Sequence, residues 1–270
     1  EITPVDGTFT ITPNAVSITA GSATKEYDGY AFTADQANPK FTTEGFVGTD
    51  NISDCVVEGS QTLVGSSVSK VKDNSWEFSE RTNGSNYAVS TATGTLTVTN
   101  RSAESKYAIT LTGASDSFTY DGTEHTINSV VSDTFTFDGV KYTVSNYVVS
   151  GAGTTYKEGG YPVTVTSGEG SYKVTDPNGN DVTEQFSIKV EPGKLTINKR
   201  PLRIIAGSAE KTYDGMPLNA SDINPKYTID ESTPLVEGDE ITSVNVSGSQ
   251  TEVGSSPSVI GTYGTAITMN

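Results

Sequence analysis

The chain has 270 residues, of which 33% are hydrophobic, and its formal net charge is −16. No stretch approaches the roughly 18 consecutive apolar residues of a membrane-spanning helix, so we expect no membrane insertion in this segment. The acidic balance repels nucleic acid and anionic membrane surfaces, and we expect neither as a partner. With 27 Gly, 11 Pro and no long stretch of apolar residues at helical spacing, the composition predicts an all-β chain.

A tripeptide, Tyr-Asp-Gly, recurs at a fixed interval. Its copies begin at Tyr27, Tyr120 and Tyr213, so both intervals are 93 residues. Self-similarity at a fixed period is typical of serial arrays, in which each unit is one structural module. Because about 100 residues make one small β-sandwich, the period predicts a string of sandwiches rather than one globule.

Further blocks recur with the tripeptide and define the register of the repeats. Residues 20–25 (AGSATK) are echoed by residues 206–211 (AGSAEK), and residues 59–67 (GSQTLVGSS) recur as residues 248–256 (GSQTEVGSS). A closing block, glycine followed by alternating threonine or lysine and apolar residues, stands at 7–11, 94–98 and 193–197.

These blocks predict four segments. Residues 1–13 are the closing strand of a preceding or neighbouring repeat, and residues 14–99 and 100–199 are two full repeats. Residues 200–270 are a third repeat that lacks its last strand or strands, because fewer residues follow its tripeptide than in the other two.

Alternating apolar and polar residues predict strands inside the repeats, at 95–99, 161–166, 172–175 and 244–247. Turn-forming pairs such as Asp138-Gly139 separate them. About seven short strands per repeat are typical of an immunoglobulin-like sandwich. The joints between repeats are short, so we expect tandem immunoglobulin-like β-sandwich domains in an elongated rod.

The Lys-x-Tyr-Asp-Gly start, the Gly-Ser-Gln-Thr-x-Val-Gly middle and the Gly-x-Leu-Thr-Ile/Val end resemble the YDG and MBG type repeats of bacterial surface proteins, over essentially the whole chain. The resemblance implies β-sandwich repeats of a stalk or adhesin that is extracellular, either secreted or attached to the cell wall. The second repeat departs from the pattern. Phe118 stands where the other repeats have lysine, and residues 151–155 (GAGTT) replace the Gly-Ser-Gln-Thr block.

The tripeptide itself has a structural interpretation. Glycine permits a positive φ in a tight turn, aspartate can cap its own backbone, and tyrosine can close one end of a core. We therefore predict a structural turn motif, rather than a ligand site, at Tyr27, Asp28, Gly29, Tyr120, Asp121, Gly122, Tyr213, Asp214 and Gly215.

Few residues could carry chemistry. Cys55 is the only cysteine and His125 the only histidine, and they lie in different predicted repeats, so no thiol is paired with a base. We expect no enzyme and no cofactor. Residues 176–181 (DPNGND) offer oxygen atoms at alternate positions, but they lack the glycine and distant glutamate of an EF-hand loop. A hairpin turn is favoured there over a metal site.

An intramolecular isopeptide bond would need a buried lysine and an asparagine across the core. Lys25 and Asn100 are the candidate pair in the first repeat. Phe118 interrupts the series of lysines, and Asn100 is predicted at a solvated strand end, so both features disfavour the bond.

Two functions remain open from the sequence. The first is a structural and adhesive stalk or fibre. The second is an array of modules that binds a glycan or a host protein through aromatic residues such as Trp76, Tyr156 and Tyr161. Aromatic residues in strands more often pack in a core or at an edge, which favours the first.

The two ends of the chain suggest a partner. A sandwich without its last strand exposes its core and an unpaired edge. Either neighbouring repeats of a longer array complete the third repeat, or copies of the chain join head to tail. In the second case Phe9 and Ile11 of one copy insert beside Val244 and Val246 of the next, and strand complementation builds an open fibre.

Overall fold

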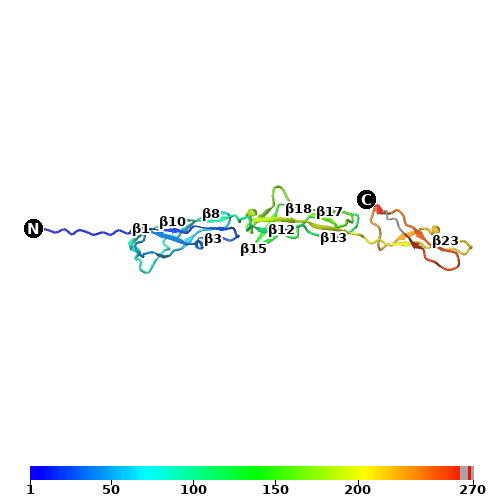
Figure 1. Ribbon diagram of the computed structural model, residues 1–270, viewed down its shortest axis with the longest axis horizontal. Helices are drawn as coiled ribbons and strands as arrows, with labels where there is room; N and C mark the ends of the chain where they lie inside the picture. The colour runs from blue at the N-terminus through cyan, green and yellow to red at the C-terminus, as the bar shows by residue number, and fades with distance from the viewer. Residues whose placement is uncertain (262–266, 269–270) are drawn as a thin grey trace. The chain divides into compact units, whose positions relative to one another are not determined.

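The computed structural model describes residues 1–261 and 267–268 (Figure 1). In this part of the chain the secondary structure is β, apart from four 3₁₀ turns of three residues each, which confirms the all-β prediction. No helix among these residues has the length and apolar character needed to cross a membrane.

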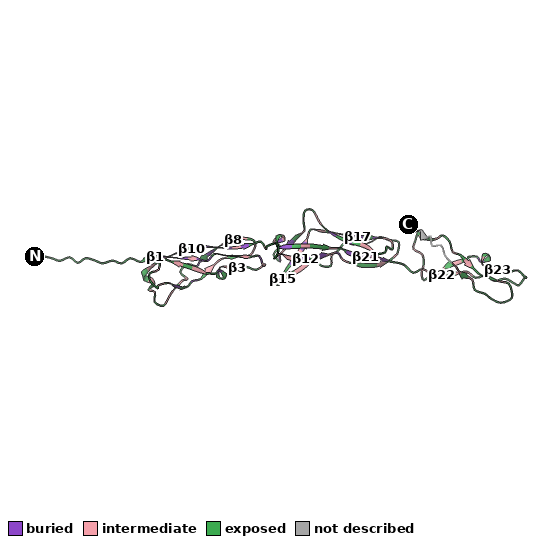
Figure 2. Ribbon diagram, viewed as in Figure 1, coloured by how far each residue is buried: buried purple, intermediate pink, exposed green. Residues whose placement is uncertain are grey.

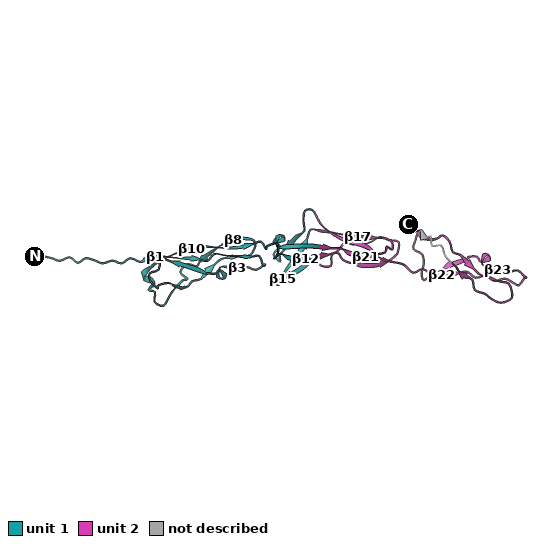
Figure 3. Cartoon of the chain, viewed as in Figure 1, with its two compact units in different colours: residues 1–110, 133–146, 169–189 teal, residues 111–132, 147–168, 190–270 magenta. Residues whose placement is uncertain are grey.

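The chain divides into two compact units (Figure 3). Unit 1 contains residues 1–110, 133–146 and 169–189, and unit 2 contains residues 111–132, 147–168 and 190–270. The division therefore falls inside residues 100–199, the predicted second repeat, and not at either predicted joint.

Residues 14–99 form the strands β1 (Asn14–Ala20), β2 (Ala23–Glu26), β3 (Phe32–Thr33), β4 (Phe41–Glu44), β5 (Ile52–Asp54), β6 (Val57–Glu58), β7 (Ser60–Gln61), β8 (Gly65–Val71), β9 (Glu77–Phe78), β10 (Tyr87–Ala92) and β11 (Gly94–Thr99), with the 3₁₀ turns η1 (Ala34–Gln36) and η2 (Gly84–Asn86).

Residues 100–199 form β12 (Tyr107–Thr112), β13 (Asp116–Thr119), β14 (His125–Ile127), β15 (Thr134–Phe137), β16 (Val140–Ser145), β17 (Tyr147–Gly153), β18 (Tyr161–Ser167), β19 (Lys173–Thr175), η3 (Thr183–Gln185), β20 (Phe186–Glu191) and β21 (Gly193–Asn198).

The remaining residues form β22 (Ile204–Ala206), β23 (Leu218–Asn219), η4 (Ala220–Asp222), β24 (Tyr227–Ile229), β25 (Glu240–Ile241), β26 (Val246–Ser247), β27 (Ser249–Gln250), β28 (Val259–Ile260) and β29 (Ile267–Thr268).

Two sheets dominate residues 14–99, with the strand orders β10-β1-β4 and β2-β11-β8-β6. The last two strands lie beside the first two and run parallel to them, β10 along β1 and β11 along β2. On its other side β11 pairs antiparallel with β8. The last strand of the repeat, β11, is therefore one of the two inner strands of the second sheet.

The sequence of β11 explains its central position. Leu96 and Val98 are buried while Thr95 and Thr99 are exposed, which is the alternation of a strand with one face on a core. Gly94 begins the strand where it crosses the chain at Gly21, and any Cβ at Gly94 would collide with backbone oxygens there. A glycine is therefore required at this position.

The second repeat keeps the same arrangement in unit 2, where the sheet order is β13-β21-β18-β17-β14 and β21 again runs parallel to β13. Its core consists of Ile127, Val163, Leu195 and Ile197. In unit 1 the strands β15, β16 and β19 form a separate antiparallel sheet.

The strands of residues 200–270 are shorter, with three residues at most, and those described pair only two by two. Residues 209–212, which correspond to β2, are not a strand, because no closing strand of the described chain lies beside them. Tyr213 is 57% exposed, whereas its counterpart Tyr27 is 1% exposed.

Residues 1–13 differ from the expectation that residues 7–11 form a strand. They carry no secondary structure, and every one of them is exposed (Figure 2). A strand needs a neighbouring strand to satisfy its backbone groups, and the described chain provides none here.

Replacing Leu96 by Ala in the centre of β11 should lower the free energy of unfolding of the first repeat by about 3 kcal/mol, because it leaves a cavity at a fully buried position. Trp76, the only tryptophan, packs against the core of this repeat, so its fluorescence in a denaturant titration reports this unfolding. Thr95→Ala on the exposed face is the matched control and should change the value by less than about 0.5 kcal/mol. Equal effects of the two variants would show that β11 has no buried face.

Candidate functional site

The Tyr-Asp-Gly motif of the first repeat is a capped turn. The Asp28 carboxylate accepts a hydrogen bond from the Tyr30 backbone N–H at 3.0 Å and is paired with the Lys25 ammonium at 2.8 Å. Gly29 adopts a φ of +84°, which glycine tolerates better than other residues. Asp28 and Gly29 therefore form a hydrogen-bonded turn.

The third repeat builds the same turn from the same residue types. Asp214 accepts from the Met216 N–H at 2.9 Å and pairs with Lys211 at 2.8 Å, and Gly215 has a φ of +77°. The ion pair and the backbone hydrogen bond hold the pKa of the Asp214 carboxyl below its usual value.

The second repeat replaces the lysine by a histidine from another strand. Phe118 stands at the lysine position, and the His125 ring stacks on it at a centroid distance of 4.2 Å. The His125 Nε2 atom then lies 3.0 Å from the Asp121 carboxylate. His125 is thus a partner of the turn.

Tyr27 and Gly29 face the second repeat, inside unit 1. Tyr27 is almost completely buried, and this burial raises the pKa of its hydroxyl well above the usual range. A Cβ added at Gly29 would lie 2.5 Å from the Tyr142 hydroxyl oxygen and 3.1 Å from Val140. One residue further along, the Tyr30 hydroxyl donates to the Asp138 carbonyl at 2.6 Å. The motif is therefore the contact surface between two successive repeats.

The linker between these repeats is fixed by two side chains that the sequence reasoning missed. Arg101 donates from its guanidinium to the Tyr27 carbonyl at 2.9 Å and to the Ser105 carbonyl at 2.6 Å, and it covers the Tyr107 ring at 4.0 Å. Gln185, which is 3% exposed, accepts from the Arg101 N–H at 3.0 Å. The linker is consequently bonded to both repeats.

A second joint, within unit 2, uses the next copy of the motif. The Tyr120 hydroxyl donates to the Asp239 carboxylate of the third repeat at 3.0 Å. A Cβ added at Gly122 would lie 2.5 Å from a methyl group of Val236. The same turn therefore meets the following repeat twice, although its partners at the two joints differ.

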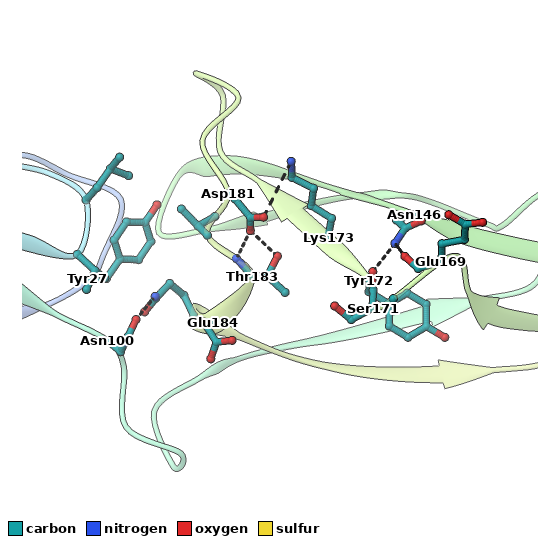
Figure 4. A pocket seen from close by; sticks show the side chains of 15 residues that line it. Tyr27, Asn100, Asn146, Glu169, Ser171, Tyr172, Lys173, Asp181, Thr183 and Glu184 are labelled. Carbon is teal, nitrogen blue, oxygen red and sulfur yellow. Dashed lines mark hydrogen bonds and ion pairs between the residues drawn. The ribbon is translucent and has the colours of Figure 1, made fainter.

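A pocket of about 760 Å³ lies beside the first joint, within unit 1 (Figure 4). Tyr27 and Asn100 line it from the first repeat, and residues 169–173 and 181–185 from the second. Its polar groups already bond one another: Asp181 accepts from the Thr183 hydroxyl at 2.7 Å. The pocket therefore lies at the junction of the two repeats, and hydrogen bonds already join polar groups of its lining.

The candidate isopeptide residues Lys25 and Asn100 have other partners. Besides Asp28, the Lys25 ammonium donates to the Tyr30 carbonyl at 3.1 Å. The Asn100 side-chain oxygen accepts from Gln185 at 2.5 Å. Each group is thus engaged in the turn or the linker.

The remaining candidates have structural surroundings. Asp176 accepts two backbone N–H bonds inside its own loop, from Asn178 at 2.9 Å and Asn180 at 2.8 Å, as expected for a hairpin turn. Among the described residues, no group of three or more His, Cys, Asp or Glu could hold a metal ion. Cys55 is 1% exposed and lies between β5 and β6, and burial raises the pKa of its thiol.

The aromatic candidates for glycan stacking have different surroundings. Trp76 packs against the core of the first repeat. Tyr161 packs against the core of the second and donates its hydroxyl to the Thr155 carbonyl at 3.0 Å. Tyr156 is 48% exposed, and the Lys199 ammonium lies over its ring at 4.5 Å.

No known protein family matches the chain, and no curated protein is significantly similar to it. The geometry of the joints is therefore the main guide to function.

Gly29→Ala should loosen the first joint, because the new methyl group meets the Tyr142 hydroxyl and the backbone is also strained at positive φ. We expect faster amide hydrogen exchange in residues 100–106 and 138–142. Gly215→Ala is the matched control, since its φ is also positive but no atom outside its chain neighbours lies within 4 Å. Unchanged exchange in Gly29→Ala would mean that the contact does not hold the joint.

The Asp121 turn should be sensitive to acid. Hydrogen bonds from the Thr123 backbone and hydroxyl, and then from His125, lower the pKa of Asp121 to about 2. Because the folded pKa lies below the unfolded value of about 3.9, the turn is stabilised above that value and loses this stabilisation as the pH falls towards about 2. A carboxyl carbon NMR titration should place the midpoint near pH 2.

Thr123→Val removes the hydroxyl donor and should move this midpoint upwards, while Thr126→Val on the exposed face of β14 should leave it in place. A wild-type midpoint near 3.9 would show that these bonds do not form in solution.

Proposed function

We propose that this chain is a structural and adhesive repeat region of an extracellular bacterial surface protein, forming a stalk or fibre. The observation that supports this most directly is the repeated use of one turn. Tyr27-Asp28-Gly29 contacts the second repeat, and Tyr120-Asp121-Gly122 contacts the third. A motif that recurs at the contact with each following repeat serves to connect modules in series.

Side-chain hydrogen bonds restrict motion at both joints between repeats. Arg101 and Gln185 bond the first linker, and the Tyr120 to Asp239 hydrogen bond joins the second and third repeats across the other linker. A joint held by several side chains transmits orientation from one module to the next, whereas a free Gly/Ser linker does not. This supports the elongated rod of immunoglobulin-like sandwiches as the proposed architecture.

The acidic charge is consistent with this role. The chain carries 33 acidic and 17 basic residues, and mutual repulsion between like-charged modules opposes their collapse onto one another. The resemblance to YDG and MBG type repeats points to the same location, outside the cell and either secreted or attached to the cell wall.

The rival proposal is an array of glycan-binding or host-protein-binding modules. Tyr156 is the aromatic residue among its three candidates that remains about half exposed, at 48%. A binding role would therefore rest on a single ring beside Lys199, which is a weak platform for a sugar.

Small-angle X-ray scattering of the chain should give a radius of gyration well above the roughly 18 Å of a compact globule of 270 residues. The Gly29→Ala variant should broaden the distribution of distances, because its first joint is loosened, while Gly215→Ala should match the wild type. A radius near that of a globule would contradict the stalk.

A glycan array and a screen against host extracellular-matrix proteins separate the two proposals. A connecting stalk should bind neither. Binding that is lost in Tyr156→Ala and kept in Tyr213→Ala would favour the module array instead.

A further inference from the structure

The dipeptide Asn-Gly is a chemically reactive step in a protein backbone. Glycine has no side chain, so its backbone nitrogen can approach the side-chain carbonyl carbon of the asparagine before it. Because both groups belong to neighbouring residues of one chain, the attack is intramolecular and has a high effective concentration. The chain contains this dipeptide twice, at Asn83-Gly84 and at Asn178-Gly179.

The structure restrains the first of these dipeptides. Asn83 precedes the 3₁₀ turn η2, and its side-chain oxygen accepts from the Ser85 N–H at 3.2 Å and from the Ser85 hydroxyl at 2.8 Å. Gly84 packs so closely on Phe78 that a Cβ there would collide with the ring. The asparagine side chain is therefore held by two hydrogen bonds, and the glycine has little room to move.

The second dipeptide lies at an exposed loop with few restraints. Asn178 and Gly179 are both exposed, and the Asn178 side chain makes no hydrogen bond with any residue that the structure describes. Around Gly179, whose φ is +82°, no atom beyond its chain neighbours lies within 4 Å of the position of a Cβ. A single hydrogen bond, from the Gly179 N–H to the Asp176 carbonyl at 3.0 Å, must open before this nitrogen can react.

We propose that Asn178 is a site of spontaneous modification, at which the asparagine is converted to aspartate and isoaspartate through a succinimide. The Gly179 nitrogen gives its proton to hydroxide and attacks the Asn178 side-chain carbonyl carbon, and the new N–C bond closes the ring. The bond from this carbon to the side-chain amide nitrogen breaks. The amide nitrogen takes a proton from water and leaves as ammonia.

Water then opens the ring at either of its carbonyl carbons. Attack at the carbon of the side chain restores the normal backbone and leaves aspartate. Attack at the backbone carbon breaks its bond to the Gly179 nitrogen, so that the chain continues through the former side chain as isoaspartate. The backbone of this product is longer by one carbon atom. Each modification consumes water, releases ammonia and adds a negative charge, and it needs no oxidant.

The loop around Asn178 is built on the neighbouring Asp176. This residue is 9% exposed, and one of its carboxylate oxygens accepts from the N–H groups of Asn178 and Asn180. The other oxygen accepts from the Asn180 side chain at 2.9 Å. A longer backbone displaces these donors, and a new carboxylate at residue 178 repels that of Asp176. We therefore expect the modification to open the loop.

This loop leads directly to the first joint between repeats, inside unit 1. Asp181, at the end of the loop, accepts from the Thr183 N–H at 3.1 Å and from the Thr183 hydroxyl at 2.7 Å, which fixes the start of η3 (Figure 4). The turn η3 ends at Gln185, whose side chain bonds the Arg101 backbone and the Asn100 side chain. A change in the loop therefore reaches the linker through η3.

The modification acts as a slow and irreversible ageing of this joint. Once the loop opens, η3 loses the support of Asp181, and Gln185 no longer holds the Arg101 N–H in place. Residues 100–106 then gain mobility. The inference goes beyond the proposed stalk and does not depend on it, because the reaction needs only the exposed dipeptide and water.

Peptide mapping by mass spectrometry tests the chemistry. The purified chain is incubated in mildly alkaline buffer and digested with trypsin, which isolates Asn178 in the peptide 174–189 and Asn83 in the peptide 82–101. We expect the first peptide to exchange NH for O and to give two separable products. Because Asn83 is held by more hydrogen bonds and its glycine is packed, Asn178 should react at least about tenfold faster.

Two controls separate the effect of the structure from that of the sequence. In denaturant the two dipeptides should react at similar rates, because both asparagines are followed by glycine. Asn178→Ser should leave the peptide 174–189 unmodified, whereas Asn83→Ser, which keeps a good residue at the start of η2, should not change the rate at Asn178.

Amide hydrogen exchange tests the effect on the joint. Exchange in residues 100–106 should become faster as the modified fraction of the incubated chain grows, and Asn178→Ser incubated in the same way should keep its original rate. Residues 65–71, which form β8 in the first repeat, are the internal control and should not change.

An unmodified Asn178 after incubation, or equal rates at Asn178 and Asn83 in the folded chain, would overturn the site. Unchanged exchange at the linker in a fully modified chain would overturn its effect on the joint. These results leave the stalk function intact, because the scattering profile tests that function separately.

Discussion

The first and second repeats each depend on pairing between their last two strands and their first two. In the first repeat β10 runs along β1 over six register pairs, and β11 runs along β2 over four. The partners are more than 70 residues apart in sequence, so the chain must complete the repeat before the second sheet gains its central strand. This pairing covers the core, buries Tyr27 and sets the geometry of the joint with the second repeat.

The first and third repeats, which share several sequence blocks, differ in whether closing strands of the described chain lie beside them. Tyr27 and Tyr213 occupy the same motif, with the same lysine and aspartate beside them, yet they are 1% and 57% exposed. The local turn forms in both, because it needs only its own carboxylate and glycine. Burial of the ring needs a covered sheet edge and a following repeat.

The sequence predicts the local features of this structure, but not the contacts between residues that are far apart in the chain. Residues 94–99 and 193–198 are strands, and the alternation of apolar and polar residues that indicates a strand is a local pattern. The role of Tyr27 at the joint depends on Tyr142, more than 100 residues away, and no local pattern contains that information. Arg101 and Gln185 were missed because a single polar residue in a linker or a 3₁₀ turn carries no periodic signal.

The second repeat shows how a departure from the motif is accommodated. Phe118 removes the lysine, and His125 stacks on the new ring and supplies a nitrogen to Asp121. Neither residue alone is informative in the sequence, because the compensation requires that β13 and β14 lie close together. A repeat array tolerates such exchanges when the carboxylate keeps its partner.

The parallel course of the closing strands also determines how a repeat responds to mechanical tension. In a parallel pair, the beginning of one strand and the end of its partner lie at opposite ends of the ladder. Tension between residue 14 and residue 99 therefore acts along the strands, and the hydrogen bonds between β1 and β10 must break together rather than one after another. A module with this strand arrangement therefore resists extension by shear between its parallel strands.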